Sequence, residues 1–133
     1  MALISHVDLP AQKLVLYNVH LESRGNENLR CSQLGEILSD LRQYPADVQV
    51  VVAGDFNADL RHEPVAAAIG KTGLINPFAH ISGRPTTIPS RSKRFPAIDW
   101  VLLKGPLIAL EPKVHDSVGA SDHYPLSLVL SQL

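Results

Sequence analysis

VQVVVAGDFN, residues 48–57, contains the strongest strand pattern in the chain. Residues 48–53 are rich in β-branched side chains and almost continuously apolar, which is typical of a strand covered on both faces. Weaker strand patterns flank it at Ala2–Val7, Lys13–Leu21, Ile98–Leu103, Leu107–Val114 and Leu126–Leu130. Two helical patterns fall between them. This alternation predicts an α/β (α+β) layered sandwich, with a mixed or mostly antiparallel sheet and flanking helices.

The segment before residue 48 has the pattern of an amphipathic helix. It opens at Gly25 and Asn26, and Asn26 suits the N-cap because its side-chain oxygen can accept from unpaired N–H groups. Apolar residues follow with helical spacing at Leu34, Ile37, Leu38 and Leu41. Cys31 extends this stripe by one turn, so we expect it in the core and not as a reactive thiol. A shorter helix is expected from Pro64 to Lys71, because proline suits a first helical turn.

Two other segments are predicted to be turns or loops. Residues 8–12 form a turn that joins the first two strands into a hairpin. Residues 74–97 show little periodicity and are expected to be mostly loop. Between Glu63 and Asp99 the sequence has no acidic residue. The basic residues in this segment are Lys71, Arg84, Arg91, Lys93 and Arg94. The segment is either a solvated loop or a positive patch that meets an anionic ligand such as phosphate.

Length and composition exclude several classes of protein. A chain of 133 residues, 45% of them apolar, suits one domain with a core. The formal net charge of −1 excludes a strongly basic protein that coats nucleic acid. Cys31 is the only cysteine, which excludes an internal disulfide framework and a Cys-rich zinc site. The chain has neither a signal-peptide pattern nor a membrane-spanning apolar run of about 20 residues, so we expect a cytoplasmic protein.

Polar residues follow the strongest strand at Asp55 and Asn57. Residues two apart on extended backbone point to the same side, so both side chains can meet one ligand at the strand end. The amide can donate to a phosphoryl oxygen while the carboxylate orients a water or a metal. The alternative is a turn in which Asp and Asn side chains cap the strand.

Three further polar positions interrupt apolar surroundings. Asp122 and His123 precede the last strand and offer an oxygen ligand and an imidazole. The alternative is that they belong to an ordinary polar loop. Asp99 lies in an apolar strand, where a carboxylate is costly unless paired, and a histidine is a natural partner. The alternative is an edge-strand acid that faces water. His20 lies among apolar neighbours, and taken alone it is better interpreted as a satisfied structural histidine than as a catalytic one.

The order of these motifs is more specific than any one of them. NVHLES, VVVAGDFN, IDWVLL and SDHYPL follow one another along the chain. This series resembles the second half of the endonuclease/exonuclease/phosphatase superfamily, the deoxyribonuclease-I-like fold. The match runs from about Leu14 to Leu130. The resemblance implies a metal-dependent phosphoesterase or phosphodiesterase, nuclease-like or phosphatase-like.

The resemblance also implies a role for each matching residue. Asp55 would orient the attacking water. Asn57 and His20 would bind the scissile phosphate, and His20 is also a candidate proton donor. Asp99 would orient His123, which would stabilise the phosphate or carry a proton. Phosphodiester hydrolysis needs an activated water and stabilisation of charge at the phosphoryl oxygens, and these residue types supply both.

A divalent metal is part of the same implication. Asp122 would be a metal ligand, together with Asp55, and the ion would be Mg²⁺ or Mn²⁺; oxygen ligands favour such ions over softer metals. Thr86 is a weaker match to a threonine near substrate in some members. Arg84 and Arg94 in the basic loop favour an extended phosphodiester, nucleic acid among the candidates.

The family domain is about twice as long as this chain. The resemblance implies a C-terminal half, because the Asn and the metal-binding Glu of the first half have no counterpart here. A sandwich cut in two exposes the apolar face of a sheet. We therefore expect a partner over that face, either a second copy or the missing N-terminal half, and weak metal affinity and little activity for the chain alone. The competing functions are a non-catalytic binding or assembly domain and a magnesium-dependent phosphate sensor.

Overall fold

A computed structural model of the chain describes residues 1–10, 12–61, 65–80, 97–117 and 120–132. Its helical elements are α1 (Glu27–Asp40), the 3₁₀ turn η1 (Leu41–Gln43) and α2 (Val65–Gly70). Its strands are β1 (Ala2–Leu9), β2 (Gln12–His20), β3 (Gln49–Asp55), β4 (Asp99–Lys104), β5 (Leu107–Val114) and β6 (Leu126–Gln132). No helix in these ranges is long and apolar enough to cross a membrane.

The strands form two sheets. β1, β2, β3 and β4 lie in that order in one mixed sheet, where β2 and β3 are parallel and the outer pairs are antiparallel. β5 and β6 form an antiparallel two-stranded sheet. β3 has a neighbour on each side and apolar cover on both faces, which explains its continuous run of valines. The predicted mixed α/β sandwich is confirmed.

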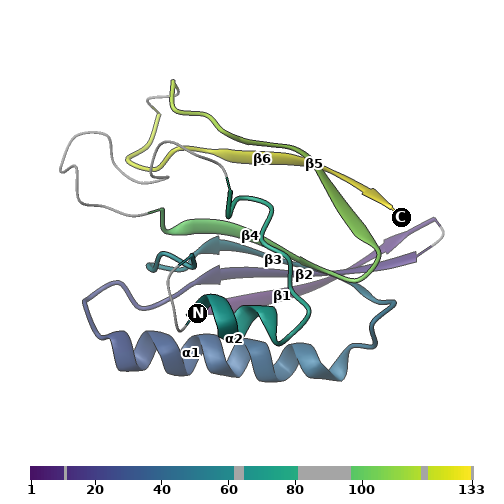
Figure 1. Ribbon diagram of the computed structural model, residues 1–133, viewed down its shortest axis with the longest axis horizontal. Helices are drawn as coiled ribbons and strands as arrows, with labels where there is room; N and C mark the ends of the chain where they lie inside the picture. The colour runs from purple at the N-terminus through teal and green to yellow at the C-terminus, as the bar shows by residue number, and fades with distance from the viewer. Residues whose placement is uncertain (11, 62–64, 81–96, 118–119, 133) are drawn as a thin grey trace.

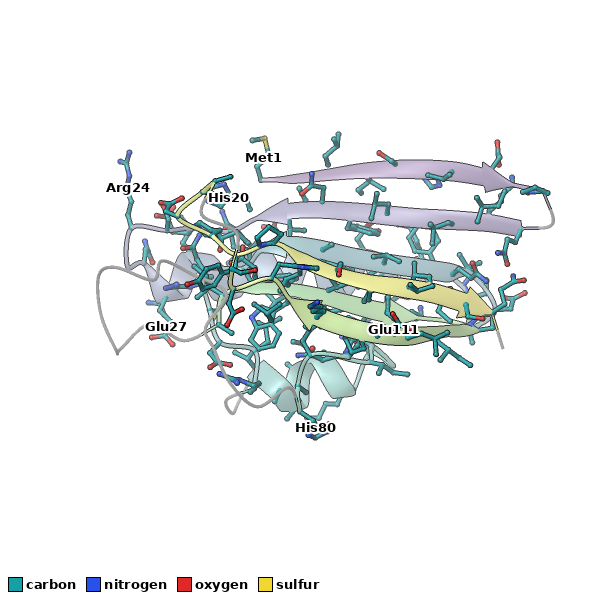
Figure 2. The ribbon with its side chains drawn as sticks, turned by 90° about the horizontal axis from the view of Figure 1, so that it is seen from above. Met1, His20, Arg24, Glu27, His80 and Glu111 are labelled. Atoms are coloured by element: carbon teal, nitrogen blue, oxygen red, sulfur yellow. The ribbon has the colours of Figure 1, made fainter. Side chains whose placement is uncertain are left out.

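The molecule has three layers (Figure 1). Helices α1 and α2 lie under the four-stranded sheet, and β5–β6 lies above it. The main core packs one face of β2, β3 and β4 against the buried side of α1. A smaller core on the opposite face joins Val51 and Leu103 to Leu107 of β5. Seen from above in Figure 2, β5 and β6 cover β3 and β4 and leave β1 and β2 uncovered.

Helix α1 begins as predicted, but one of its expected core residues is outside the core. The side chain of Asn26 accepts a hydrogen bond from the Leu29 N–H at 3.0 Å, and the stripe that starts at Leu34 is buried. Cys31, however, is exposed, so its prediction as a core residue is wrong. The first turn of α1 reaches past the ends of β2 and β3 in Figure 1, where no strand covers that side of the helix.

Several boundaries differ from the predicted ones. The strands of the first hairpin pair as far as Leu9 opposite Gln12, so the turn between them is shorter than expected. β3 continues through Gly54 to Asp55. Helix α2 is described from Val65, and its predicted first residue, Pro64, lies outside the described residues.

Gly54 allows β2 and β3 to approach each other closely at their ends. Its φ is +138°, and a Cβ at this position would lie only 2.0 Å from the Val19 carbonyl oxygen. Only glycine combines this backbone conformation with this contact. The next residue on each strand is a predicted site residue, His20 on β2 and Asp55 on β3.

Candidate active site

The predicted site residues meet at one end of the four-stranded sheet. Parallel strands β2 and β3 both end there, and antiparallel β4 begins there. The register therefore places His20 beside Asp55, and Asp55 beside Asp99. His123 reaches this edge from the segment before β6. The local topology thus brings together residues that are far apart in the sequence.

Asp99 and His123 form the predicted carboxylate–imidazole pair. His123 Nδ1 lies 2.9 Å and 3.1 Å from the two carboxylate oxygens of Asp99. Burial lowers the pKa of His123, but the hydrogen bond with Asp99 and the charges of Asp99, Asp55 and Asp122 outweigh this and leave the pKa raised. The alternative of an unpaired edge-strand acid is wrong, because Asp99 is mostly buried and paired.

His20 is accessible at the mouth of the site. Its Nε2 lies 3.8 Å from an oxygen of Asp55, and its side chain is 67% exposed whereas that of Asp55 is mostly buried. The interpretation of His20 as a satisfied structural histidine is not supported, because its side chain is mostly exposed. An exposed imidazole next to a carboxylate at a strand end can reach a ligand from solvent. Figure 2 shows His20 at the same end of the molecule as Arg24 and Glu27.

Asp55 and Asn57 form a tight turn as well as part of the site. The Asn57 N–H donates to Asp55 Oδ1 at 2.7 Å, so the capping turn offered as the alternative is present. Asn57 has a φ of +50°, which asparagine tolerates better than most residues. Its amide Nδ2 donates to the Leu21 carbonyl at 3.0 Å and ties the ends of β3 and β2 together.

Sequence analysis missed two groups that hold this turn. The Arg30 guanidinium of α1 donates to the Asn57 carbonyl. On the other side, Trp100 Nε1 donates to the Ala58 carbonyl at 2.9 Å. The sequence shows Arg30 only as a basic residue near the start of a predicted helix. Such residues are too common for this one to be identified as a contact of the site.

An ion pair stacks on the same tryptophan. Arg61 is held by Asp59 in a bidentate pair, with nitrogen–oxygen distances of 2.8 Å and 2.6 Å. The guanidinium carbon lies 5.5 Å from the centre of the Trp100 ring. The Asp59 carboxylate raises the pKa of Arg61 by hydrogen bonding, against a smaller opposite effect of burial. Sequence analysis singled out neither residue of the pair.

Three of the site residues can offer ligand atoms to one metal ion. Potential ligand atoms of Asp55, Asp99 and His123 all lie within 4.8 Å of one another. Asp122, the predicted metal ligand, is exposed and accepts a hydrogen bond from Ser121 Oγ at 3.4 Å. Two carboxylates and an imidazole suit a divalent cation, and the carboxylate oxygens suit magnesium or manganese.

The remaining predicted site residues cannot be placed. Thr86, Arg84 and Arg94 lie outside the described residues.

Glu22, two residues after His20, turns its carboxylate toward its own loop, where it accepts a hydrogen bond from the Arg24 N–H at 2.7 Å. Its own N–H donates to Gln33 Oε1 of α1 at 2.8 Å.

Known proteins resemble this chain in sequence and in fold. A sequence model of a protein family, described as "Endonuclease/Exonuclease/phosphatase family", matches residues 13–123 of this chain. Protein angel of Drosophila melanogaster is 24% identical over 78% of this chain and 37% of that protein. Among solved structures, humanized D. rerio TDP2 carrying 14 mutations aligns with a TM-score of 0.75 and 21% identity, over 98% of this chain and 60% of that chain.

A second solved structure gives the same result. The endonuclease/exonuclease/phosphatase from Beutenbergia cavernae DSM 12333 aligns with a TM-score of 0.74 and 22% identity, over 98% of this chain and 39% of that chain. The chain thus spans between 37% and 60% of the length of these three proteins. At such identities the structures establish a shared fold.

Proposed function

The chain belongs to the endonuclease/exonuclease/phosphatase family, and on this basis we propose that it carries the catalytic half of a metal-dependent phosphoesterase. In this proposal an activated water hydrolyses a phosphate ester. The observation that carries the proposal is the convergence of Asp55, Asp99 and His123, with His20 beside them, at one edge of the sheet.

Asp55 is the candidate that orients the attacking water. It is mostly buried, its Oδ1 accepts the Asn57 N–H, and its Oδ2 faces His20. The hydrogen bond from the Asn57 N–H limits the freedom of the Asp55 carboxylate, which favours a single direction for a water that binds to it. The same hydrogen bond closes the capping turn, so the proposed role of Asp55 is compatible with the cap.

Asn57 and His20 are the candidates for binding the phosphate. One N–H of the Asn57 amide is directed at the Leu21 carbonyl, which fixes the plane of the amide and leaves its other N–H for a phosphoryl oxygen. His20 is exposed next to this turn and can donate a proton to the leaving oxygen.

His123 is the candidate for stabilising charge on the phosphate or carrying a proton. Its Nδ1 bonds to Asp99, which leaves its Nε2 as the ring nitrogen that would meet a bound phosphate. Asp99 also favours the protonated ring, because it raises the pKa of His123 against the opposing effect of burial. A protonated imidazole is the form that can stabilise an anionic phosphoryl group.

The proposed cofactor is Mg²⁺, with Mn²⁺ as a substitute. Asp55 and the exposed Asp122 would hold it; potential ligand atoms of Asp55 cluster with those of Asp99 and His123, and Asp122 lies outside this cluster. Such an ion supplies charge stabilisation at a phosphoryl oxygen. The proposed substrate class is a phosphodiester, nucleic acid among the candidates, and the basic segment with Arg84, Thr86 and Arg94 is the proposed additional contact.

The test combines metal binding with turnover. Mn²⁺ added to the ¹⁵N-labelled chain should broaden the amide signals of Asp55, Asp122 and their neighbours Asp99 and His123 before those of other residues. Hydrolysis of a bis-aryl phosphodiester should be slow and should require Mg²⁺. Both effects should disappear in Asp55→Ala and persist in Asp8→Ala, which removes an exposed carboxylate at the opposite end of the sheet.

Each other outcome has a defined meaning. Unselective broadening, together with equal hydrolysis by Asp55→Ala and the unchanged chain, would contradict the proposal. Selective broadening and phosphate binding without turnover would favour the phosphate sensor. If the chain binds a protein partner and Asp55→Ala binds it equally well, the binding or assembly domain would be favoured.

A further inference from the structure

Helix α1 changes character along the side that faces the sheet. Leu34 and Ile37 on this side are buried in the main core. One turn closer to the start of the helix, the same side carries Arg30 and Gln33, both half-buried. In Figure 1 the start of α1 reaches past the ends of β2 and β3. Polar side chains thus replace apolar ones where the helix meets the loops that follow these two strands.

Arg30 and Gln33 each hold one of these loops. The Arg30 guanidinium donates to the Asn57 carbonyl in the turn after β3. The Gln33 side chain accepts a hydrogen bond from the Glu22 N–H at 2.8 Å, in the loop after β2. Because a backbone N–H can only donate, this contact fixes which end of the Gln33 amide faces the loop. We call the pair of Arg30 and Gln33 the α1 clamp.

The two loops are also joined directly, which closes a ring of contacts. Nδ2 of Asn57 donates to the Leu21 carbonyl at 3.0 Å, and the Leu21 N–H donates to the Asp55 carbonyl at 2.9 Å. Leu21 is adjacent to Glu22, which bonds to Gln33. A path from α1 to the turn after β3, across to the loop after β2 and back to α1 is therefore continuous. Each loop is held from two sides, and loss of one clamp contact leaves it with support from one side.

We propose that Arg30 and Gln33 are positioning residues for the phosphoester hydrolysis, an inference that rests on the proposed function. Neither residue is assigned a contact with the substrate. Arg30 holds the main chain of Asn57, whose amide is the candidate phosphate ligand. Gln33 holds the loop that begins directly after His20, the last residue of β2. The clamp fixes the amide of Asn57 and the imidazole of His20 relative to each other, so that both can reach the same phosphoryl group.

Asn57 needs such support because of its backbone conformation. Its φ of +50° lies in the left-handed region, which costs free energy in a residue other than glycine and persists where the surrounding structure holds it. When the donor of Arg30 is lost, the turn can relax toward a more common conformation, and the amide of Asn57 moves with it. A displacement of about 1 Å at a binding group can lower a rate by about a hundredfold.

The first measurement follows the side-chain amide of Asn57 by NMR, without substrate or metal. Arg30→Met and Gln33→Met remove one clamp contact each and keep an unbranched side chain. Both should shift the Asn57 signals and speed exchange of its amide protons with solvent by about two- to tenfold, the factor that corresponds to one hydrogen bond. Arg30→Lys keeps a donor and Gln33→Glu keeps an acceptor, so these two variants should restore most of the original signals.

The second measurement is Mg²⁺-dependent hydrolysis of a bis-aryl phosphodiester, at a temperature at which circular dichroism shows every variant to be folded. The two methionine variants should lower kcat/KM by about tenfold or more, and the lysine and glutamate variants should recover most of this loss. The matched controls are Arg42→Met and Gln43→Met in η1, beyond the far end of α1. Arg42 is exposed, and Gln43 gives up a hydrogen bond to Asp40. Both controls should stay within about twofold of the unchanged chain.

The outcomes separate this inference from the proposed function. Unchanged Asn57 signals in Arg30→Met and Gln33→Met would overturn the clamp itself. Altered signals with undiminished turnover, or equal losses of turnover in the η1 controls, would overturn its positioning role while the proposed function stands. Absence of Mg²⁺-dependent turnover in the unchanged chain would overturn the proposed function, and altered Asn57 signals would then establish the clamp as a structural contact alone.

Discussion

Replacing Gly54 by alanine should destabilise the chain far more than replacing Gly35 of α1, where a Cβ would meet open space. Its Cβ would lie 2.0 Å from the Val19 carbonyl oxygen, whereas ordinary contacts begin at 3.4 Å, so β2 and β3 would have to separate by more than an ångström. A non-glycine residue in this region of φ costs about 1–3 kcal/mol. Overpacking adds about 1–3 kcal/mol. We therefore expect a loss of about 2–6 kcal/mol, a large part of the roughly 5–15 kcal/mol that a domain has.

The matched control is Gly35→Ala in α1. No atom lies within 4 Å of a Cβ at Gly35, and alanine favours a helix over glycine. This variant should gain about 0.5–1 kcal/mol. Urea unfolding followed by circular dichroism, at low temperature if Gly54→Ala is unstable at 25 °C, measures both values. If Gly54→Ala remained within about 1 kcal/mol of the unchanged chain, the tight approach of β2 and β3 inferred from the structure would be wrong.

Three other substitutions test the groups around the site. Asp99→Asn should lower the pKa of His123 in an NMR titration, because burial lowers this pKa and the variant loses the hydrogen bond and charge of Asp99 that act against burial. The variant's stability deficit should be full below pH 6.5, the ordinary pKa of histidine, and should shrink as the pH rises through the raised folded-state pKa. An unchanged imidazole titration would contradict that pairing. Arg30→Ala should cost about 1.5–3 kcal/mol of unfolding free energy, because it removes a charged donor from the Asn57 carbonyl. The control Arg24→Ala, at an exposed residue, should cost less than about 0.5 kcal/mol. Equal losses in the two variants would refute the role of Arg30. Trp100→Phe should cost about 1–3 kcal/mol in urea unfolding by leaving the Ala58 carbonyl without its indole donor, and a neutral result would contradict this contact.

Much of the architecture could be predicted because it depends on local patterns. The valines of β3 and the leucine stripe of α1 reflect burial on two faces and on one face, and the structure confirms both. Cys31 fits the stripe equally well but is exposed, because periodicity does not show where the sheet above a helix ends.

The candidate site was predictable where strand ends carry polar residues, as at Asp55 and Asp99. The cost of burying an unpaired carboxylate predicted that Asp99 has a partner and that a histidine would suit it, whereas His123 as that partner came from the family resemblance. The contacts of Arg30 and Trp100 could not be predicted, because they depend on the tertiary position of a helix and a loop relative to the strand ends. A long side chain that bonds to a distant carbonyl leaves no periodic signal in the sequence.

The register between β3 and β4 places two carboxylates opposite each other. Asp55 and Asp99 are direct cross-strand partners, and like charges in this arrangement oppose sheet formation. A cation that binds between them therefore acts on the folding equilibrium as well as on any reaction. For a ligand at ten times its dissociation constant, mass action adds about 1.4 kcal/mol to the unfolding free energy. The melting temperature should therefore rise with the concentration of a cation that binds between Asp55 and Asp99. The size of this rise at one concentration can rank ions by affinity before any substrate has been identified.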